Sequence, residues 1–545
     1  MVGSQQMLKA GARCTLCPAG CGVLRVRVGP DSWRIDPPLE GAAGLCPRGA
    51  ALGELLTHRD RILWPVCVEA AGRRQIDLSA AAAAIVQAAG ERDLLVFLDG
   101  NVPCEQIAQA AAWCQAWPKA RLCVVIEPAD EQLLLGAEAS GADYLADDAL
   151  GDCDGFVLIG DVFAANPCCA RGIFQRRAED SRTPIVAIDP AAGTAAKFAT
   201  HAVQAGVGQE ALALAAVAAA AGVEARLPGA PSPAEMPSAT AAGKAIARCG
   251  RLGVIVAAEY GRSTAWRQVG YLAGRLAAAL GGGLACQTVG ANALAALRCG
   301  RKLGTVPLVE ALADRAAAWV VIGGDLLGML GWMPQGILAA AAALSNRTTE
   351  AAEFVLPLAL TAEMGGTVLL GGAREADVEP ILPPPAGVPT GAEIVAQLAR
   401  AAGIRPPQAA SGPLATERLS VEPPAESGNG QAPAAPVLLF ARQAAQAGCG
   451  ALTAHGSWQQ ATQPLPELRI SAADAAELAI RHLATVHVSA AGLSVDAKAQ
   501  VCQLLPDGVV VLPEGTAAAR RLAMCQVDEA AGQVVARPVT VEITP

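Results

Sequence analysis

The sequence is poor in aromatic residues, in basic charge and in long apolar runs. Aromatic side chains make up 3% of the 545 residues, and the net charge is −9. An acidic chain without a basic stripe cannot neutralise the phosphates of a nucleic acid, so we expect no nucleic-acid partner. No run of about 18–20 strongly apolar residues is present, so we also expect no membrane span.

The first residues contain no apolar segment of the kind that starts a secretory signal. We therefore expect a cytoplasmic protein, either free or on the periphery of a membrane complex. Hydrophobic residues make up 53% of the chain, which is enough for several packed domains.

Seventeen cysteines stand out against this composition. Most occur singly among apolar residues, where a small buried side chain is the ordinary interpretation. Four lie near the N-terminus in a C-x2-C-x3-C-x24-C pattern: Cys14, Cys17, Cys21 and Cys46. Three thiolates so close together can surround one face of a compact inorganic cluster, while the fourth returns from a separate turn. Structural zinc sites usually combine two separated pairs, so this spacing favours a [4Fe-4S] cluster over the alternative of zinc.

With its motifs CTLCPAGC, CPRG and HRDRILWP, this segment resembles the N-terminal [4Fe-4S] module of the molybdopterin oxidoreductase superfamily. That superfamily includes formate dehydrogenases, formylmethanofuran dehydrogenases and the large subunit of NADH-quinone oxidoreductase (complex I). The resemblance implies that the four cysteines bind the cluster. It also implies that Arg48, two positions after Cys46, lies between the cluster and a pterin.

Short apolar runs alternate with Ala-rich helical stretches in the middle of the chain. The runs lie at 94–98, 122–126, 156–159, 185–188, 252–256 and 319–322. They are bounded by Gly, Asp or Pro, as buried parallel strands are, and such strands carry ligand sites at their carboxyl ends. We therefore expect a doubly wound α/β region in two subdomains.

The resemblance extends this picture over the whole chain. It implies a [4Fe-4S] domain at 1–66, the α/β region at 67–404, a Pro/Ala/Ser linker at 405–436 and a double-psi β-barrel-like domain at 437–545. Strand-like runs at 486–488, 500–504 and 509–512 fall in the last of these.

Three strand ends resemble the nucleotide-binding turns of the superfamily. The residues that this resemblance assigns to a pterin dinucleotide are Gly160, Asp161, Asn166, Asp189, Gly323, Gly324 and Asp325. Alanine follows Asp189-Pro190 where the superfamily usually has arginine, and aliphatic residues replace several polar ones. We therefore expect these sites to be vestigial, with side chains in place of the pterin.

A catalytic member of the superfamily needs a metal ligand beside a histidine. Cys123 is the first choice by its distance from Cys46, but it lies in an apolar run without a neighbouring His. Cys104, which follows a proline in a loop, ranks lower. Cys168 and Cys169 are adjacent in a strand-end loop, and two adjacent cysteines rarely share one tetrahedral metal. No acid/base pair for the oxidation of formate is recognisable.

Two functions follow as hypotheses. The first is an iron–sulfur electron-transfer and scaffold subunit of a multisubunit oxidoreductase, which has lost the molybdenum site and is not catalytic alone. Its partners would be other redox subunits of ferredoxin-like, flavin or dehydrogenase type. The alternative is a catalytic enzyme of formate or formylmethanofuran dehydrogenase type, with molybdenum or tungsten on a bis-pterin guanine dinucleotide and Cys123 as metal ligand.

Overall fold

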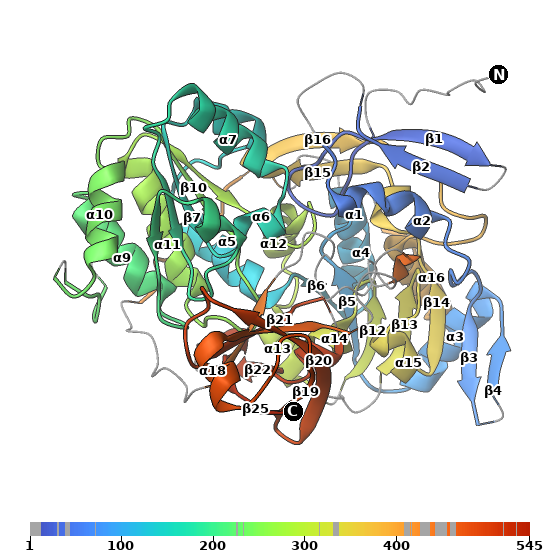
Figure 1. Ribbon diagram of the computed structural model, residues 1–545. Helices are drawn as coiled ribbons and strands as arrows, with labels where there is room; N and C mark the ends of the chain where they lie inside the picture. Colours follow the sequence, from blue (N-terminus) through green and yellow to red (C-terminus); the bar gives the residue numbers. More distant parts are fainter. Residues whose placement is uncertain are drawn as a thin grey trace.

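The structure is a computed structural model, and it describes most of the chain. The described residues are 12–29, 32–38, 44–70, 72–224, 227–232, 234–315, 317–330, 337–407, 415, 417–425, 436–441, 455–457, 465–515, 517–529 and 531–545. Figure 1 shows a lobe at the left built on one sheet, a lobe at the right built on a second sheet, and the C-terminal domain below both. None of the helices in these ranges is long and apolar enough to cross a bilayer.

The N-terminal module is small and packs on the right-hand lobe. It consists of the hairpin β1 (Leu24–Gly29) and β2 (Ser32–Asp36) and the short helices α1 (Pro47–Ala50) and α2 (Leu52–Leu56). The chain between 343 and 381 closes over it: Gly371 donates a backbone hydrogen bond of 2.8 Å to Pro18, and Ala12 pairs with Glu379 in an isolated bridge.

A seven-stranded sheet forms the right-hand lobe, in the order β4-β3-β14-β13-β12-β5-β6. Its strands are β3 (Val66–Glu69), β4 (Gly72–Gln75), β5 (Leu94–Asp99), β6 (Ala120–Val125), β12 (Ala318–Ile322), β13 (Ile337–Ala342) and β14 (Phe354–Pro357). The five from β14 to β6 are parallel, and β3 runs antiparallel to β14.

The two faces of this sheet bury alternate residues of each strand, as the pleat requires. Leu94, Val96 and Leu98 pack with the helices α3 (Leu78–Ala89), α4 (Cys104–Ala116) and α16 (Gly391–Ala401). Leu95 and Phe97 point to the other face, in an apolar layer that the C-terminal domain shares. The sheet is therefore covered on both sides.

A five-stranded parallel sheet, inserted between β6 and β12, forms the left-hand lobe in the order β11-β10-β7-β8-β9. Its strands are β7 (Gly155–Ile159), β8 (Ile185–Ile188), β9 (His201–Val203), β10 (Leu252–Val256) and β11 (Gly283–Cys286). The helices α5 (Pro128–Ser140), α9 (Glu210–Ala220), α10 (Pro237–Ile246) and α11 (Trp266–Ala279) cover one face. The other face packs on a 3-10 helix (Asp147–Asp152) and on α6 (Val162–Ala165), α7 (Cys169–Glu179) and α8 (Thr194–Phe198).

The apolar runs predicted as strands are strands. All six runs form parallel strands: β5, β6, β7, β8, β10 and β12. Helices cover both faces of the five-stranded sheet. Helices cover one face of the seven-stranded sheet, and the C-terminal domain packs on its other face. The mixed α/β architecture predicted from the sequence is thus confirmed.

The C-terminal domain is a nearly closed, barrel-like sheet in the order β24-β17-β21-β18-β20-β19-β25. Its strands are β17 (Val437–Ala441), β18 (Glu467–Ser471), β19 (Thr485–Ala490), β20 (Leu493–Cys502), β21 (Val509–Pro513), β24 (Val539–Thr540) and β25 (Glu542–Thr544). Two of its pairs, β17–β21 and β18–β20, are parallel, and the others are antiparallel.

The remaining elements connect these parts. They are α12 (Ala293–Lys302), α13 (Leu308–Ala313), α14 (Leu326–Leu330), α15 (Arg347–Ala351), α18 (Ala472–Glu477), α19 (Ala517–Arg520) and the hairpins β15 (Gly366–Leu370) with β16 (Arg374–Val378) and β22 (Cys525–Asp528) with β23 (Gln533–Ala536).

More than half of the predicted linker 405–436 lies outside the described residues, and in the described part Ala415 is buried while the other residues are exposed or half-buried. Leu419 donates a backbone hydrogen bond of 2.6 Å to the carboxylate of Glu138, and the buried Arg298 pairs with the same carboxylate and with the carbonyl of Ala415. The described part of this segment forms no helix or strand, and it completes the hydrogen bonding of a buried ion pair.

Candidate functional site

The four cysteines of the N-terminal motif lie together in the module. Cys14, Cys17, Cys21 and Cys46, which we call the cysteine cluster, are buried, with exposed fractions of 4, 7, 7 and 9%. The backbone N–H of Cys14 donates to the carbonyl of Cys21 over 2.8 Å, which folds the loop back on itself. Gly20 makes this turn possible: its φ of +53° is left-handed, and a Cβ there would overlap Leu370.

The charges of these groups act on one another. Burial raises the pKa of Cys14 well above its ordinary value, and the neighbouring Cys17 adds to the rise. Burial also raises the pKa of Cys17, to about 12, against the opposing effect of Arg48. Thiols in such surroundings ionise when a metal supplies positive charge, which is how cysteine ligands behave in general.

The donors of the cysteine cluster are four buried thiols. A [4Fe-4S] cluster takes one thiolate on each of its four irons, so the number and the chemistry of these donors suit it. Among the described residues, no group of three cysteine, histidine or carboxylate side chains is arranged so that it could hold a metal ion.

Arg48 lies beside the cysteine cluster, close enough to Cys14 and Cys17 for their charges to interact. It is in α1, buried to 3% exposure, and its guanidinium donates to the carbonyl of Ala165 at the end of α6. Its positive charge opposes the rise in the pKa of both Cys14 and Cys17. Arg48 therefore links the cysteine cluster to the strand-end loop of the five-stranded sheet.

A fifth cysteine meets the cysteine cluster. The Sγ of Cys168 is 3.7 Å from that of Cys21, and it also lies 3.7 Å from the carbonyl of Gly44. The sequence showed only that Cys168 follows a strand, and no local pattern relates it to Cys21, which is 147 residues away.

The residues of the five-stranded sheet that were predicted to bind a nucleotide lie close together. Their side chains, however, form hydrogen bonds and ion pairs with other groups of the chain. Asp189 accepts hydrogen bonds of 2.8 Å from the backbone N–H groups of Ala191 and Gly193. It also forms a buried ion pair with Arg262, whose guanidinium pairs with Glu259 as well. These carboxylates are thus occupied by the protein.

Asp161 and Asn166 are engaged in the same way. Asp161 accepts a bond of 3.0 Å from the backbone of Thr194. The amide of Asn166 donates to Asp147 over 2.6 Å and to Gln287 over 3.0 Å, and its oxygen accepts from the backbone of Cys168. Gly160 is left-handed, with a φ of +76°, and a Cβ on it would meet the carbonyl of Ala257.

Asp325, at the end of β12, stabilises a helix. Its Oδ1 accepts from the backbone of Gly328, the first turn of α14, and from both the backbone and the hydroxyl of Thr348. Gly323 and Gly324 have left-handed φ values of +81° and +65° and line a cavity.

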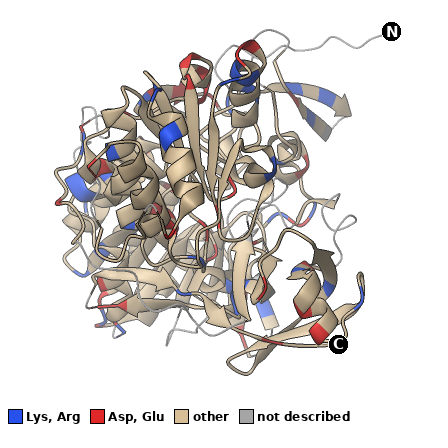
Figure 2. Ribbon diagram, turned by 60° about the vertical axis from the view of Figure 1, so that its left-hand side comes forward, with Lys and Arg blue, Asp and Glu red and all other residues tan. Residues whose placement is uncertain are grey.

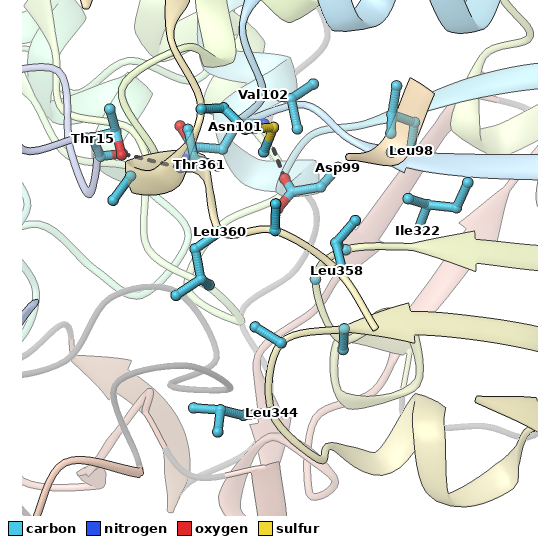
Figure 3. A pocket seen from close by; sticks show the side chains of 18 of the residues that line it. Thr15, Leu98, Asp99, Asn101, Val102, Ile322, Leu344, Leu358, Leu360 and Thr361 are labelled. Carbon is cyan, nitrogen blue, oxygen red and sulfur yellow. Dashed lines mark hydrogen bonds between the residues drawn. The ribbon is translucent and has the colours of Figure 1, made fainter. Parts of the chain in front are cut away.

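This cavity lies between the loop of the cysteine cluster and the carboxyl ends of the seven-stranded sheet. Its volume is about 150 Å³, and its wall includes Thr15, Asp99, Asn101 and Thr361 (Figure 3). Asn101 ties the two sides together, since its amide donates to the Thr15 carbonyl over 3.0 Å and its backbone donates to Asp99. Burial raises the pKa of Asp99. Pockets for ligands of drug size measure about 300–1,000 Å³, so this cavity suits a smaller molecule than a dinucleotide.

Cys123 does not belong to this site. It is fully buried in β6 opposite Phe97 of β5, in the apolar layer shared with the C-terminal domain. Burial raises its pKa far above the ordinary value. Its surroundings give it a packing role, so the sequence-based choice of Cys123 as a metal ligand finds no support in the fold.

Cys104, which the sequence ranked lower, is buried as well but has a second thiol as its neighbour. It is the first residue of α4, close to Cys299 and Asn292. A hydrogen bond from Cys299 lowers the pKa of Cys104 despite its burial. The signal in the sequence was its place directly after a strand-end loop.

The comparisons with known proteins agree with this architecture. Residues 437–543 match the family model of the molydopterin dinucleotide binding domain. Acetylene hydratase from Pelobacter acetylenicus has a similar structure, with a TM-score of 0.71 and 12% sequence identity over 98% of this chain and 100% of that one. No curated protein matches the sequence. The chain thus has the same fold as acetylene hydratase, and its residues 437–543 are similar to molydopterin dinucleotide binding domains.

Proposed function

We propose that this protein is an iron–sulfur electron-transfer and scaffold subunit of a multisubunit oxidoreductase. The observation that carries the proposal is the burial of Cys14, Cys17, Cys21 and Cys46 in one small module beside the buried guanidinium of Arg48. These thiols would hold one [4Fe-4S] cluster, which takes up and releases single electrons when bound. The module keeps water away from the sulfurs, and Arg48 favours the more negative charge state.

The scaffold part of the proposal rests on the strand ends. Asp189 is bonded to the backbone and to Arg262, and Asp325 holds the start of α14. The cavity of about 150 Å³ is too small for a pterin dinucleotide as it stands. The aspartates at these strand ends are bonded to the chain itself, so we derive no chemistry from a bis-pterin group.

Electron transfer through a single cluster needs partners on both sides. We infer other redox subunits of ferredoxin-like, flavin or dehydrogenase type, in the cytoplasm or at the edge of a membrane complex. Figure 2 shows acidic and basic residues interspersed over most of the ribbon. The strand β1 carries Arg25 and Arg27, whereas Arg34 of β2 is paired with Asp36 of the same strand. This hairpin packs against Cys14 and Cys21 through Val23 and Ile35, so its positive charge supports an acidic partner close to the cluster.

The test is the metal content of the full chain purified without oxygen. We expect about four irons and an electron paramagnetic resonance signal after reduction, as a [4Fe-4S] cluster requires. Cys17→Ser is expected to lose the signal and most of the iron. Cys114→Ala, which changes a buried cysteine of α4 outside the cluster, is expected to keep both. Zinc in place of iron, or an unchanged signal in Cys17→Ser, would refute the proposal.

A second function is favoured by one observation, the match of residues 437–543 to the molydopterin dinucleotide binding domain. In this alternative the chain is a molybdenum or tungsten enzyme of formate or formylmethanofuran dehydrogenase type. Molybdenum or tungsten with pterin in the same preparation would establish it. The metal ligand would then be sought at Cys104, with Cys104→Ala expected to abolish formate turnover and Cys123→Ala expected to leave it unchanged.

A further inference from the structure

Cys21 and Cys168 face each other across two segments of the chain that the fold holds in place. Their Sγ atoms are 3.7 Å apart. On one side, the carbonyl of Cys21 accepts from the backbone of Cys14 over 2.8 Å. On the other, the backbone N–H of Cys168 donates to Asn166 over 3.1 Å, and Asn166 is itself bound to Asp147. The approach of the two thiols is thus fixed from both sides.

The two thiols differ in access. Cys21 is buried, whereas Cys168 is half-buried, so a small reagent reaches Cys168 first. The neighbouring Cys169 offers a contrast, because it is buried and its thiol donates to the carbonyl of Asn166 over 3.0 Å. Only one of these two adjacent cysteines therefore combines access with a second sulfur within reach.

We propose that Cys21 and Cys168 form a disulfide in the cluster-free chain, and that this modification controls the loading of the cluster. A disulfide bond has an S–S length of about 2.05 Å, so the sulfurs must approach by about 1.7 Å. The second half of the proposal rests on the proposed function, since it concerns a ligand of the cluster.

The oxidant is a low-molecular-weight disulfide such as glutathione disulfide. The Cys168 thiolate attacks one sulfur of the oxidant, which forms a mixed disulfide and releases one glutathione thiolate. The Cys21 thiolate then attacks the Cys168 sulfur and releases the second. Two protein thiols lose two electrons, the oxidant gains them, and the two protons leave on the two glutathione thiols.

Oxidation and cluster binding exclude each other at Cys21. A sulfur in a disulfide has no thiolate with which to bind iron. The disulfide therefore protects Cys21 from irreversible oxidation, but the oxidised chain cannot bind a cluster. A reductant breaks the disulfide and restores Cys21 as a ligand.

The first experiment looks for the bond itself. The full chain, freed of metal with a chelator and reduced, is treated with glutathione disulfide, alkylated, digested and mapped by mass spectrometry. We expect a linked pair of peptides containing Cys21 and Cys168 in the natural chain and in Cys169→Ala, and none in Cys168→Ala. Circular dichroism checks that each variant is folded, and Cys168→Ser serves if the alanine variant is not. Absence of the pair, or pairing of Cys21 with Cys14 or Cys17 instead, overturns the proposal.

The second experiment measures loading with ferrous iron and sulfide. We expect the oxidised natural chain to take up about tenfold less iron than the reduced one, and dithiothreitol to restore uptake. If the linked pair forms and the reduced chain takes up no iron, the proposed function fails and the disulfide stands. If the reduced chain loads fully and no linked pair is found, the function stands and this inference fails. Equal loading of a chain that carries the disulfide would refute its control over the cluster.

Discussion

The guanidinium of Arg61 and the carboxylate of Glu363 are joined by two hydrogen bonds, of 2.7 Å between Nη1 and Oε1 and of 2.9 Å between Nη2 and Oε2. Their side chains are 3 and 1% exposed. Arg61 lies at the end of the N-terminal module, and Glu363 follows β14, so this ion pair joins the cysteine-bearing module to the α/β region.

Removing one partner of that pair should cost stability. Arg61→Ala leaves the Glu363 carboxylate buried without its main partner, and we expect the free energy of unfolding to fall by about 3–5 kcal/mol. Arg61→Lys keeps the charge but cannot form both hydrogen bonds, and we expect it to lose less stability than the alanine variant. Urea unfolding followed by circular dichroism measures both. A loss of under about 1 kcal/mol in the alanine variant, the size of an exposed pair, would contradict the assigned role.

A second prediction concerns pH. Glu210 is fully buried at the start of α9, and burial raises its pKa to about 7, against the opposing charge of Arg262. The folded chain therefore keeps a proton that the unfolded chain releases near 4.5. This contribution to stability is complete below 4.5 and is lost as the pH rises through about 7.

Glu210→Gln should remove this dependence. Relative to the variant, the natural chain is expected to lose about 2–3 kcal/mol of stability between pH 5 and pH 8. The measurement is urea unfolding of both proteins at the two pH values, and the difference between them isolates Glu210 from the other groups. Parallel behaviour of the two proteins would mean that Glu210 is ionised in the folded state throughout this range.

Arg48 offers a prediction on the redox potential of the proposed cluster. Its charge lies beside Cys14 and Cys17 and stabilises the form that carries the additional electron. Arg48→Gln is expected to shift the midpoint potential to a more negative value by about 60 mV, a tenfold change for a one-electron couple. Arg48→Lys should shift it less. A titration followed by electron paramagnetic resonance gives the values, and a positive shift in the glutamine variant would exclude the electrostatic role.

Tyr260 joins the five-stranded lobe to the C-terminal part. Its hydroxyl lies 2.6 Å from the carbonyl of Ala523 and 3.2 Å from that of Met329, and its ring packs on Phe440 and Arg520. Tyr260→Phe removes the single hydroxyl proton, which the closer carbonyl of Ala523 accepts, and is expected to cost about 1–3 kcal/mol. Thermal unfolding measures the loss. Unchanged stability would show that another donor satisfies this carbonyl.

The sequence predicted the strands of both α/β sheets because buried parallel strands are continuous apolar runs, and such runs are local. Short strands of small residues, such as β9 (His201–Val203) and β11 (Gly283–Cys286), carry no such signal and were missed. The order of the strands was also out of reach, since β3 pairs with β14 only through a return of the chain nearly 300 residues later.

In the candidate site, too, the features that depend on local sequence could be predicted, whereas those that depend on contacts between distant segments could not. The cysteine pattern is local, and the structure places its four members together. The approach of Cys168 to Cys21 and the pairing of Asp189 with Arg262 depend on contacts between distant segments, which no local pattern encodes. Cys123 was chosen by its distance along the sequence, and that distance says nothing about the apolar layer in which it lies.

The closure of the N-terminal module by the chain between 343 and 381 has a consequence for synthesis. The cysteines leave the ribosome about 350 residues before Gly371, whose backbone N–H donates to the carbonyl of Pro18 beside them. At a synthesis rate of about 5–20 residues per second, about 20–70 s pass between the synthesis of the cysteines and that of the segment that covers them. The segment with the four cysteines is therefore synthesised well before the segment that covers it, and the cell has that interval in which to shield its thiols.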